Sequence, residues 1–163
     1  MIFLAILSMI LITAYTAAVC IKNKGVPASI SATFYTLEHK GWFLAAMWGT
    51  AGLLMPAILE VSNPGTEIWA FLASAGMLLV GVAPNFKETF EGKVHTSGAV
   101  LCLLASQIWV ALNCPWCLTL WAVYLVGTLE EMQRGKTFLE TRPLFWVELF
   151  ALLGTFVSVF KAV

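Results

Sequence analysis

Long uninterrupted apolar segments constrain this chain more than any other feature of its sequence. The hydrocarbon core of a bilayer is about 30 Å thick, and a helix rising about 1.5 Å per residue crosses it in about 20 residues. Windows of roughly this size, nearly free of charge, follow one another at residues 1–21, 42–62, 68–86, 96–113, 117–132 and 144–163. Their apolar residues are continuous and do not alternate with a period of two, so these windows predict helices rather than strands.

The composition indicates where these helices must lie. Of the 163 residues, 60% are hydrophobic and 11% are charged, against roughly 45–50% and about 25% in soluble domains. A single core in a chain of this size cannot hide that much apolar surface from water, so the surplus must face lipid. We therefore predict an all-α fold, a polytopic integral membrane helical bundle of six transmembrane helices forming one domain over residues 1–163.

The charge balance argues against several other classes of protein. Nine Lys and Arg residues balance nine acidic residues, all of them glutamates, so the net charge is zero. No basic surface for a nucleic acid is indicated, and disorder is excluded because it requires low hydrophobicity and high net charge. Two histidines and scattered glutamates without close ligand spacing predict no metal site.

The first window is predicted to be a retained span. Met1, Ile2 and Phe3 carry no side-chain charge, whereas a secretory signal begins with basic residues and ends at a small-residue cleavage site. We therefore expect all six windows to be present together in the folded protein.

The cations indicate how the helices are oriented. Eight of the nine fall in three links, residues 22–41, 87–95 and 130–143, and the ninth is Lys161. Cytoplasmic loops carry an excess of Lys and Arg. We therefore expect these links in the cytoplasm and both termini outside, with the bacterial inner membrane as the location. Within the first link, residues 26–39 are predicted to form an amphipathic interfacial helix opened by Pro27.

Small and polar residues recur at helical spacing within the windows and are expected to face the bundle interior, because such residues form helix contacts in membranes. The second window carries Ala45, Gly49, Gly52, Pro56 and Glu60. The fourth carries His95, Ala99, Cys102, Ser106, Trp109 and Asn113. The fifth carries Cys117, Trp121, Tyr124, Thr128 and Glu131. Close helix packing alone explains the Gly, Ala, Ser and Thr positions.

Glu148 is the leading candidate for function. A carboxylate inside a span costs about 2.5–3.5 kcal/mol at mid-membrane, and Glu148 lies in the sixth window near its cytoplasmic end. The ligand-binding residues expected at that level are Glu148, His95, Asn85, Tyr124 and Thr128. A Glu and a His meeting there would suit a proton relay, an acid/base pair or an ion or headgroup site. The alternative is a structural hydrogen bond between the fourth and sixth spans, with His95 at the water interface.

A second constellation is the sequence Cys114-Pro115-Trp116-Cys117, which the predicted topology places at the outer face. Together with Leu118 and the multi-span bundle, it resembles the span-capping CxxC of the vitamin K epoxide reductase and bacterial disulfide-bond-forming quinone reductase families. The resemblance implies an outward thiol–disulfide couple that exchanges electrons with a quinone and a thioredoxin-like partner. Those families use a second cysteine pair on the same side, whereas the remaining thiols here are Cys20 and Cys102. An interfacial Pro-Trp turn with structural cysteines is the alternative.

The middle of the chain carries a second resemblance. Its residues are Val26, Pro27 and Ser31 before the second window, Gly81 and Pro84 closing the third, and Gly92, His95, Gly98 and Ala99 opening the fourth. This pattern is similar to six-span bacterial membrane proteins of unknown function related to the Frag/DRAM family. The resemblance implies a fold and a position for a histidine, and no activity.

These observations favour one function and leave two alternatives open. The favoured interpretation is a polar intramembrane pocket on the cytoplasmic side that binds a lipid-like or small amphiphilic molecule, with translocation or processing of that molecule left open. The second is the thiol–disulfide/quinone oxidoreductase with Cys114 and Cys117 as its catalytic pair and a quinone as its cofactor. The third is a structural or scaffold bundle. Membrane lipid is the expected partner, and a second copy of the chain or another membrane protein is left open.

Overall fold

The computed structural model describes residues 1–83 and 88–162, and it contains no strand within those ranges. The prediction of an all-α fold is confirmed. The elements are α1 (Ile2–Lys22), the 3-10 helix η1 (Ser31–Thr36), α2 (Lys40–Val61), α3 (Glu67–Val82), α4 (Glu88–Asn113), the 3-10 helix η3 (Pro115–Thr119), α5 (Leu120–Gln133) and α6 (Pro143–Ala162).

Within the described residues, four helices are long and apolar enough to cross a membrane. They are α1, α2, residues Glu91–Asn113 of α4, and α6. Helix α3 is apolar but has 16 residues, and α5 has 14. At about 1.5 Å per residue, these two helices are shorter than the hydrocarbon core is thick.

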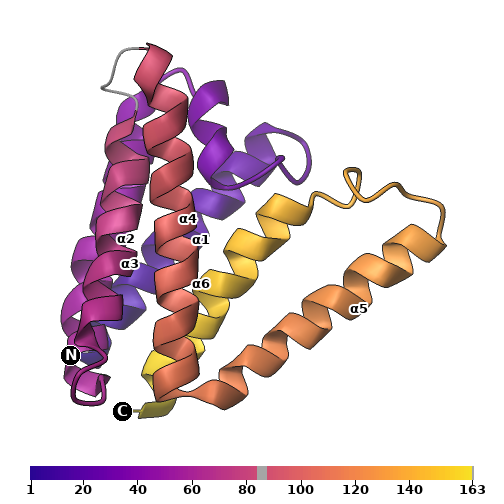
Figure 1. The fold of residues 1–163 in the computed structure, drawn as a ribbon. Coiled ribbons are helices and arrows are strands. Elements are labelled where there is room, and N and C mark those ends of the chain that lie inside the picture. Colours follow the sequence, from indigo (N-terminus) through magenta and orange to yellow (C-terminus); the bar gives the residue numbers. More distant parts are fainter. Residues whose placement is uncertain (84–87, 163) are drawn as a thin grey trace.

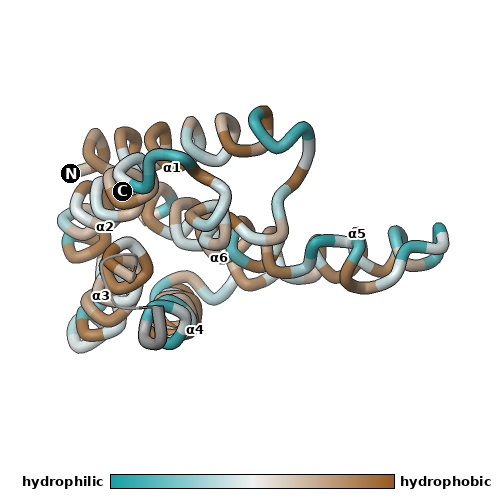
Figure 2. Tube along the Cα trace, turned by 90° about the horizontal axis from the view of Figure 1, so that it is seen from above, coloured by the Kyte–Doolittle hydropathy of each residue, from teal (hydrophilic) through white to brown (hydrophobic). Residues whose placement is uncertain are grey.

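Helices α1 to α4 lie side by side in chain order, and each runs antiparallel to the one before it (Figure 1). Helix α6 contacts α4, α1 and α2. Helix α5 extends away from the other helices, and hydrophilic residues gather mainly at helix ends and links (Figure 2). The core therefore lies among α1 to α4 and α6, and no residue of α5 is buried.

The closest helix contact is the crossing of α3 and α4 at Gly76 and Gly98. A Cβ at Gly76 would meet the Gly98 carbonyl oxygen at 2.7 Å and the Cys102 Cα at 2.8 Å. A Cβ at Gly98 would meet the Gly76 carbonyl oxygen at 2.9 Å. Only glycine allows the two backbones to approach this far, as small residues do in membrane helix pairs.

Side-chain hydrogen bonds join α4 to its neighbours at the end opposite η1. The Asn113 Oδ1 accepts a bond from the Asn63 backbone N–H at 2.7 Å, which fixes the turn between α2 and α3. The Gln107 amide donates to the Ala151 carbonyl of α6 at 3.2 Å and accepts from the Trp121 indole of α5 at 2.9 Å. Three helices are therefore tied together through Gln107.

The structure corrects the link predicted at residues 87–95. Helix α4 begins at Glu88, so residues 88–95 form its first two turns instead of a loop. Hydropathy marks the part of a helix that suits lipid and does not mark where the helix itself begins. Charged turns continue the helix beyond the apolar window.

The structure also corrects the amphipathic helix predicted over residues 26–39. Only Ser31–Thr36 is helical, as a six-residue 3-10 helix. Gly25 adopts φ +156°, a non-helical backbone conformation, so no continuous helix runs through Gly25 to Pro27. Ile30 and Phe34 are buried in the core cluster and do not cover a membrane surface.

One of the predicted interior stripes, that of α2, is wrong. In α2, Ala45, Gly52 and Glu60 are exposed, and the buried face is Phe43, Ala46, Met47, Thr50, Ala51, Leu54, Ala57 and Ile58. In the fifth window, Cys117 is buried, and Trp121, Tyr124, Thr128 and Glu131 form the half-buried face of a helix whose other residues after Leu120 are exposed. Apolar residues of any size can face either lipid or protein, so residue size alone does not identify the face of a helix that lies in the bundle interior. In α4, by contrast, His95 and Trp109 of the predicted stripe are buried.

The described Lys and Arg residues gather at one end of the helices, except for Lys161 near the other end. The junctions of α1 with α2, of α3 with α4, and of α5 with α6 lie at one end, and both chain termini lie at the other (Figure 1). Seven of the eight predicted link cations belong to these junctions, Lys87 lies outside the described residues, and Lys161 is near the opposite end.

The substitution Gly76→Ala tests the close crossing of α3 and α4. The added methyl group overlaps backbone atoms of α4, so we expect the free energy of unfolding to fall by about 1–3 kcal/mol. Gly52→Ala is the matched control, because nothing lies within 4 Å of a Cβ there, and we expect it to be neutral or stabilising by about 0.5–1 kcal/mol. Thermal unfolding in detergent measures both. Equal melting temperatures for the two variants would contradict the crossing.

Candidate functional site

One carboxylate joins α6 to the irregular segment between α1 and α2. The Glu148 Oε2 accepts hydrogen bonds from the Ile30 N–H at 2.5 Å and the Ser31 N–H at 3.1 Å, and its Oε1 accepts from the Ser31 hydroxyl at 2.5 Å. Ile30 is the N-cap residue of η1, and N–H groups at a helix start have no partner within the helix. Glu148 therefore satisfies donors that would otherwise be left unpaired.

Further contacts hold η1 against α1 and α2. The Tyr15 hydroxyl of α1 lies 2.5 Å from the Thr33 hydroxyl. The Phe34 ring is fully buried and packs on Phe43, with the ring centroids 5.6 Å apart. The Lys40 ammonium lies 4.2 Å from the Phe34 centroid, a cation–π contact. The η1 segment is thereby fixed over one end of the bundle.

A cavity of about 460 Å³ lies beneath η1, within the range of about 300–1,000 Å³ that is typical of ligand pockets. Its walls come from η1 and from α1, α2, α3, α4 and α6, and no residue of α5 contributes. Most of the wall is apolar. The polar side chains near η1 are Ser29, Ser31, Tyr35, His95 and Glu148. Further hydroxyl groups line the cavity at Ser74, Ser106 and Thr155, so its polar groups are not confined to the end near η1.

The cavity opens between α4 and α6. The exposed residues of its lining include Val100 on α4 and Leu144 on α6, with exposed fractions of 49% and 63%. The lining residues on α1 and α2 are buried. Helices α4 and α6 approach each other at the Gln107 contact and diverge toward η1 (Figure 1). The rim of the opening therefore contains apolar side chains on both helices, together with the exposed polar residues Thr96 on α4 and Tyr35 on η1.

His95 lies at the polar end of this cavity. Its exposed fraction is 8%, and its buried Nδ1 has no hydrogen-bond partner among the described residues. The Tyr35 ring lies beside it, with the centroids 5.9 Å apart. A buried polar atom without a partner is uncommon in native proteins, and His95 is a residue of the cavity wall.

The structure brings together some of the predicted ligand-binding residues and not others. Glu148 and His95 both line the cavity. Asn85 lies outside the described residues. Tyr124 and Thr128 belong to α5 and do not line the cavity, and the Tyr124 ring packs against Phe150 instead.

Sequence reasoning missed the partners of Glu148. Its hydrogen bonds go to Ile30 and Ser31 in the link, and none joins it to His95. The alternative interpretation, a structural bond between the fourth and sixth spans through these two side chains, is therefore not seen among the described residues. The pattern Ser29-Ile30-Ser31 in an apolar link was the available signal, because serine hydroxyls bond carboxylates readily.

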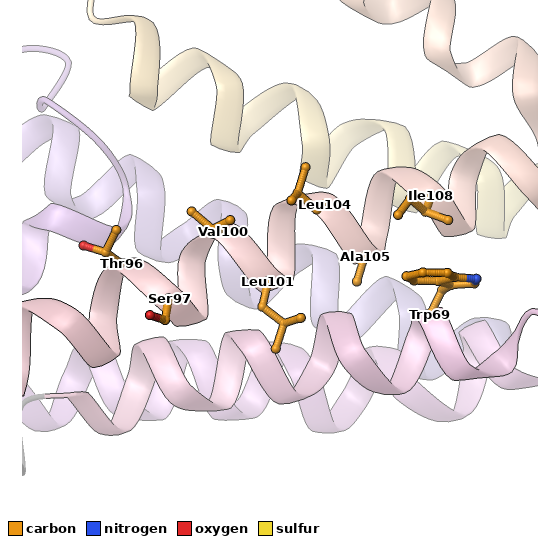
Figure 3. A pocket seen from close by; sticks show the side chains of 8 residues that line it. All are labelled: Trp69, Thr96, Ser97, Val100, Leu101, Leu104, Ala105 and Ile108. Carbon is orange, nitrogen blue, oxygen red and sulfur yellow. The ribbon is translucent and has the colours of Figure 1, made fainter.

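A second hollow is a shallow groove on the outer face of α4, which Figure 3 shows beside Trp69 of α3. Its floor is apolar, with the Thr96 and Ser97 hydroxyls at one end. No charged side chain lines it. A groove of this kind on an apolar helix suits a lipid chain, and the two hydroxyls at its end are uncharged hydrogen-bonding groups.

Cys114 and Cys117 meet at the opposite end of the bundle from η1. The two sulfurs are 3.0 Å apart, both cysteines are free, and each residue has an exposed fraction of 7%. Cys20 and Cys102 are also free, and Cys102 lines the cavity. The predicted pair is therefore close enough to form a bond after a small movement, although reactive thiols are usually more accessible.

Among the described residues, no group of three or more His, Cys, Asp or Glu side chains is placed to hold a metal ion. Comparison of the chain with family models, with curated proteins and with solved structures finds no match. The two family resemblances drawn from the sequence stay predictions.

Removal of the Glu148 carboxylate tests its role in holding η1. Glu148→Ala leaves two backbone donors unpaired, so we expect a loss of about 1–3 kcal/mol in stability and faster hydrogen exchange and proteolysis over residues 25–39. Glu140 gives the matched control. Bonds from the Thr137 backbone N–H and hydroxyl hold the pKa of this exposed loop carboxyl below its usual range. Glu140→Ala should change exchange only in its own loop, and equal protection of residues 25–39 in Glu148→Ala and the unchanged protein would contradict the role.

The cysteine pair makes a separate prediction. Mild oxidation with diamide should join Cys114 to Cys117, because the two thiols lose two hydrogens to the oxidant without a large backbone movement. Mass spectrometry of unreduced peptides would show a linked peptide lighter by two hydrogens, while Cys20 and Cys102 stay thiols. Complete alkylation of all four cysteines after oxidation would show the prediction to be wrong.

Proposed function

We propose that this chain is a six-span membrane protein that binds a lipid-like or small amphiphilic molecule in the cavity beneath η1. The observation that carries the proposal is the cavity itself, with its apolar walls, its polar end at His95 and Glu148, and its opening between two apolar helices. Translocation or processing of the bound molecule would be a further step.

The shape of the cavity supports an amphiphile over a water-soluble ligand. A molecule that enters between Val100 and Leu144 passes these apolar side chains, with the Thr96 hydroxyl beside them on α4. Its apolar part then lies along α2 and α3, and its head meets the polar groups beneath η1. A small polar solute would gain little from walls of this composition.

The topology supports the same placement. Six spans require α3, and η3 followed by α5, to cross together with the four longer helices. The cation-rich junctions share one end, which we assign to the cytoplasm of a bacterial inner membrane by the positive-inside rule. Both termini then lie outside, and the polar end of the cavity lies on the cytoplasmic side.

A thiol–disulfide oxidoreductase is the second candidate. The separation of 3.0 Å between the Cys114 and Cys117 sulfurs favours it. A quinone would accept the electrons, and a thioredoxin-like protein would have to reach sulfurs that are nearly buried. Formation of the disulfide without exchange with such a protein would leave a structural role for this pair.

Filling the cavity tests the proposed function. Ala99 lines the cavity on α4, so Ala99→Trp should lower the amount of copurifying amphiphile by about tenfold by occupying its volume. Leu112→Trp places the same ring on an exposed position of α4 that lines neither the cavity nor the groove and should leave that amount unchanged. Mass spectrometry of organic extracts from the purified proteins measures both, with thermal unfolding to show that each variant is folded.

Two results would contradict the proposal. One is the absence of any amphiphile from the unchanged protein together with no thermal shift when amphiphiles are added. The other is equal copurification by both tryptophan variants. Either result would favour the structural or scaffold interpretation, in which α5 and its exposed apolar residues serve a membrane-protein partner.

A further inference from the structure

The polar end of the cavity has a specific hydrogen-bonding deficit. His95 lines the cavity, and its buried Nδ1 has no hydrogen-bond partner among the described residues. The imidazole is held in place on one side by the Tyr35 ring. A ligand that places a polar atom against this nitrogen would satisfy a group that the protein leaves unsatisfied.

Glu148 has an acceptor position left over. An ionised carboxylate offers about four acceptor positions, and the donors of Ile30 and Ser31 occupy three of them. Two of these bonds reach Oε2 and one reaches Oε1. The remaining position is therefore on Oε1 and is suited to a hydrogen-bond donor.

The charge of the cavity wall excludes one kind of head group. Among the described residues that line the cavity, Glu148 is the only charged one, and none is a Lys or an Arg. Lys40, the cation nearest to η1 in the chain, lies over the Phe34 ring. A phosphate or carboxylate head would meet a like charge with no cation in the wall to compensate it.

We infer that the cavity selects amphiphiles whose head group donates a hydrogen bond and carries no negative charge, bound by the His95 Nδ1 and the Glu148 Oε1. This inference rests on the proposed function and gives it a ligand class. Long-chain alcohols and long-chain amines share the required chemistry, whereas fatty acids and phosphate-bearing lipids do not.

A tail-matched series of probes tests the inference. The full chain is placed in phosphatidylcholine nanodiscs, and equilibrium binding is measured for oleyl alcohol, oleylamine, oleate and oleyl phosphate. We expect the alcohol and the amine to bind at least about tenfold more tightly than the two anions. Whichever of the two binds more tightly identifies the natural head group as neutral or cationic.

Variants at His95 test whether this residue contributes a hydrogen bond to the ligand or only fills space. His95→Leu should weaken binding of the alcohol by about tenfold, and His95→Asn should restore most of it, because the Asn amide reaches the position of Nδ1. Melting temperatures show whether each variant is folded. The ranking of the four probes on the unchanged protein needs no variant at all.

The outcomes of these experiments distinguish a failure of the inference from a failure of the proposed function. Saturable binding that Ala99→Trp abolishes, but with the anions bound as tightly as the alcohol, would overturn the inference and keep the proposed function. Equal binding of the alcohol by His95→Leu and the unchanged protein would also overturn it. Failure of all four probes to bind saturably would contradict the proposed function itself.

Discussion

Three hydrogen bonds to the Glu148 carboxylate hold a non-helical segment over the end of a bundle made of apolar helices. Irregular backbone near a membrane interior is tolerated only where its polar groups are satisfied by protein or water. A carboxylate in an apolar helix is equally unfavourable without donors. The carboxylate therefore satisfies the donors of η1, and those donors stabilise the carboxylate. The cavity, the position of Tyr35 and the burial of Phe34 all depend on η1 being held there.

The helices divide into a close-packed part and a looser part. The α3–α4 crossing brings backbones together at Gly76 and Gly98 and leaves no room for a ligand. Helix α6 is tied to α4 through Gln107 and Ala151, far along the helix from η1. Because that tie is at one end, α4 and α6 separate toward the other end, and the cavity occupies the space between them. The close α3–α4 pair and the divergent helix α6 together leave the cavity between them.

The sequence predicts the helices well because the length of an apolar segment indicates directly whether that segment prefers lipid or water. The same signal gives no information on where charged helical turns begin, which is why residues 88–95 were expected as a link. It also does not distinguish lipid from protein, so the interior face of α2 was misplaced. Glu148 and His95 were identified because buried polar groups are costly. The partners of Glu148 were missed because they are mostly backbone groups, which every residue carries.

Under the proposed function, the exposed lining at Val100 and Leu144 has a consequence for how occupancy of the cavity by an amphiphile is controlled. A cavity that exchanges with the bilayer samples the mole fraction of an amphiphile among the surrounding lipids, not its concentration in water. Bulk lipid is then a competitor in large excess, and dilution of the aqueous phase does not empty the cavity. Changes in membrane composition would alter its occupancy directly, without any carrier or receptor in solution.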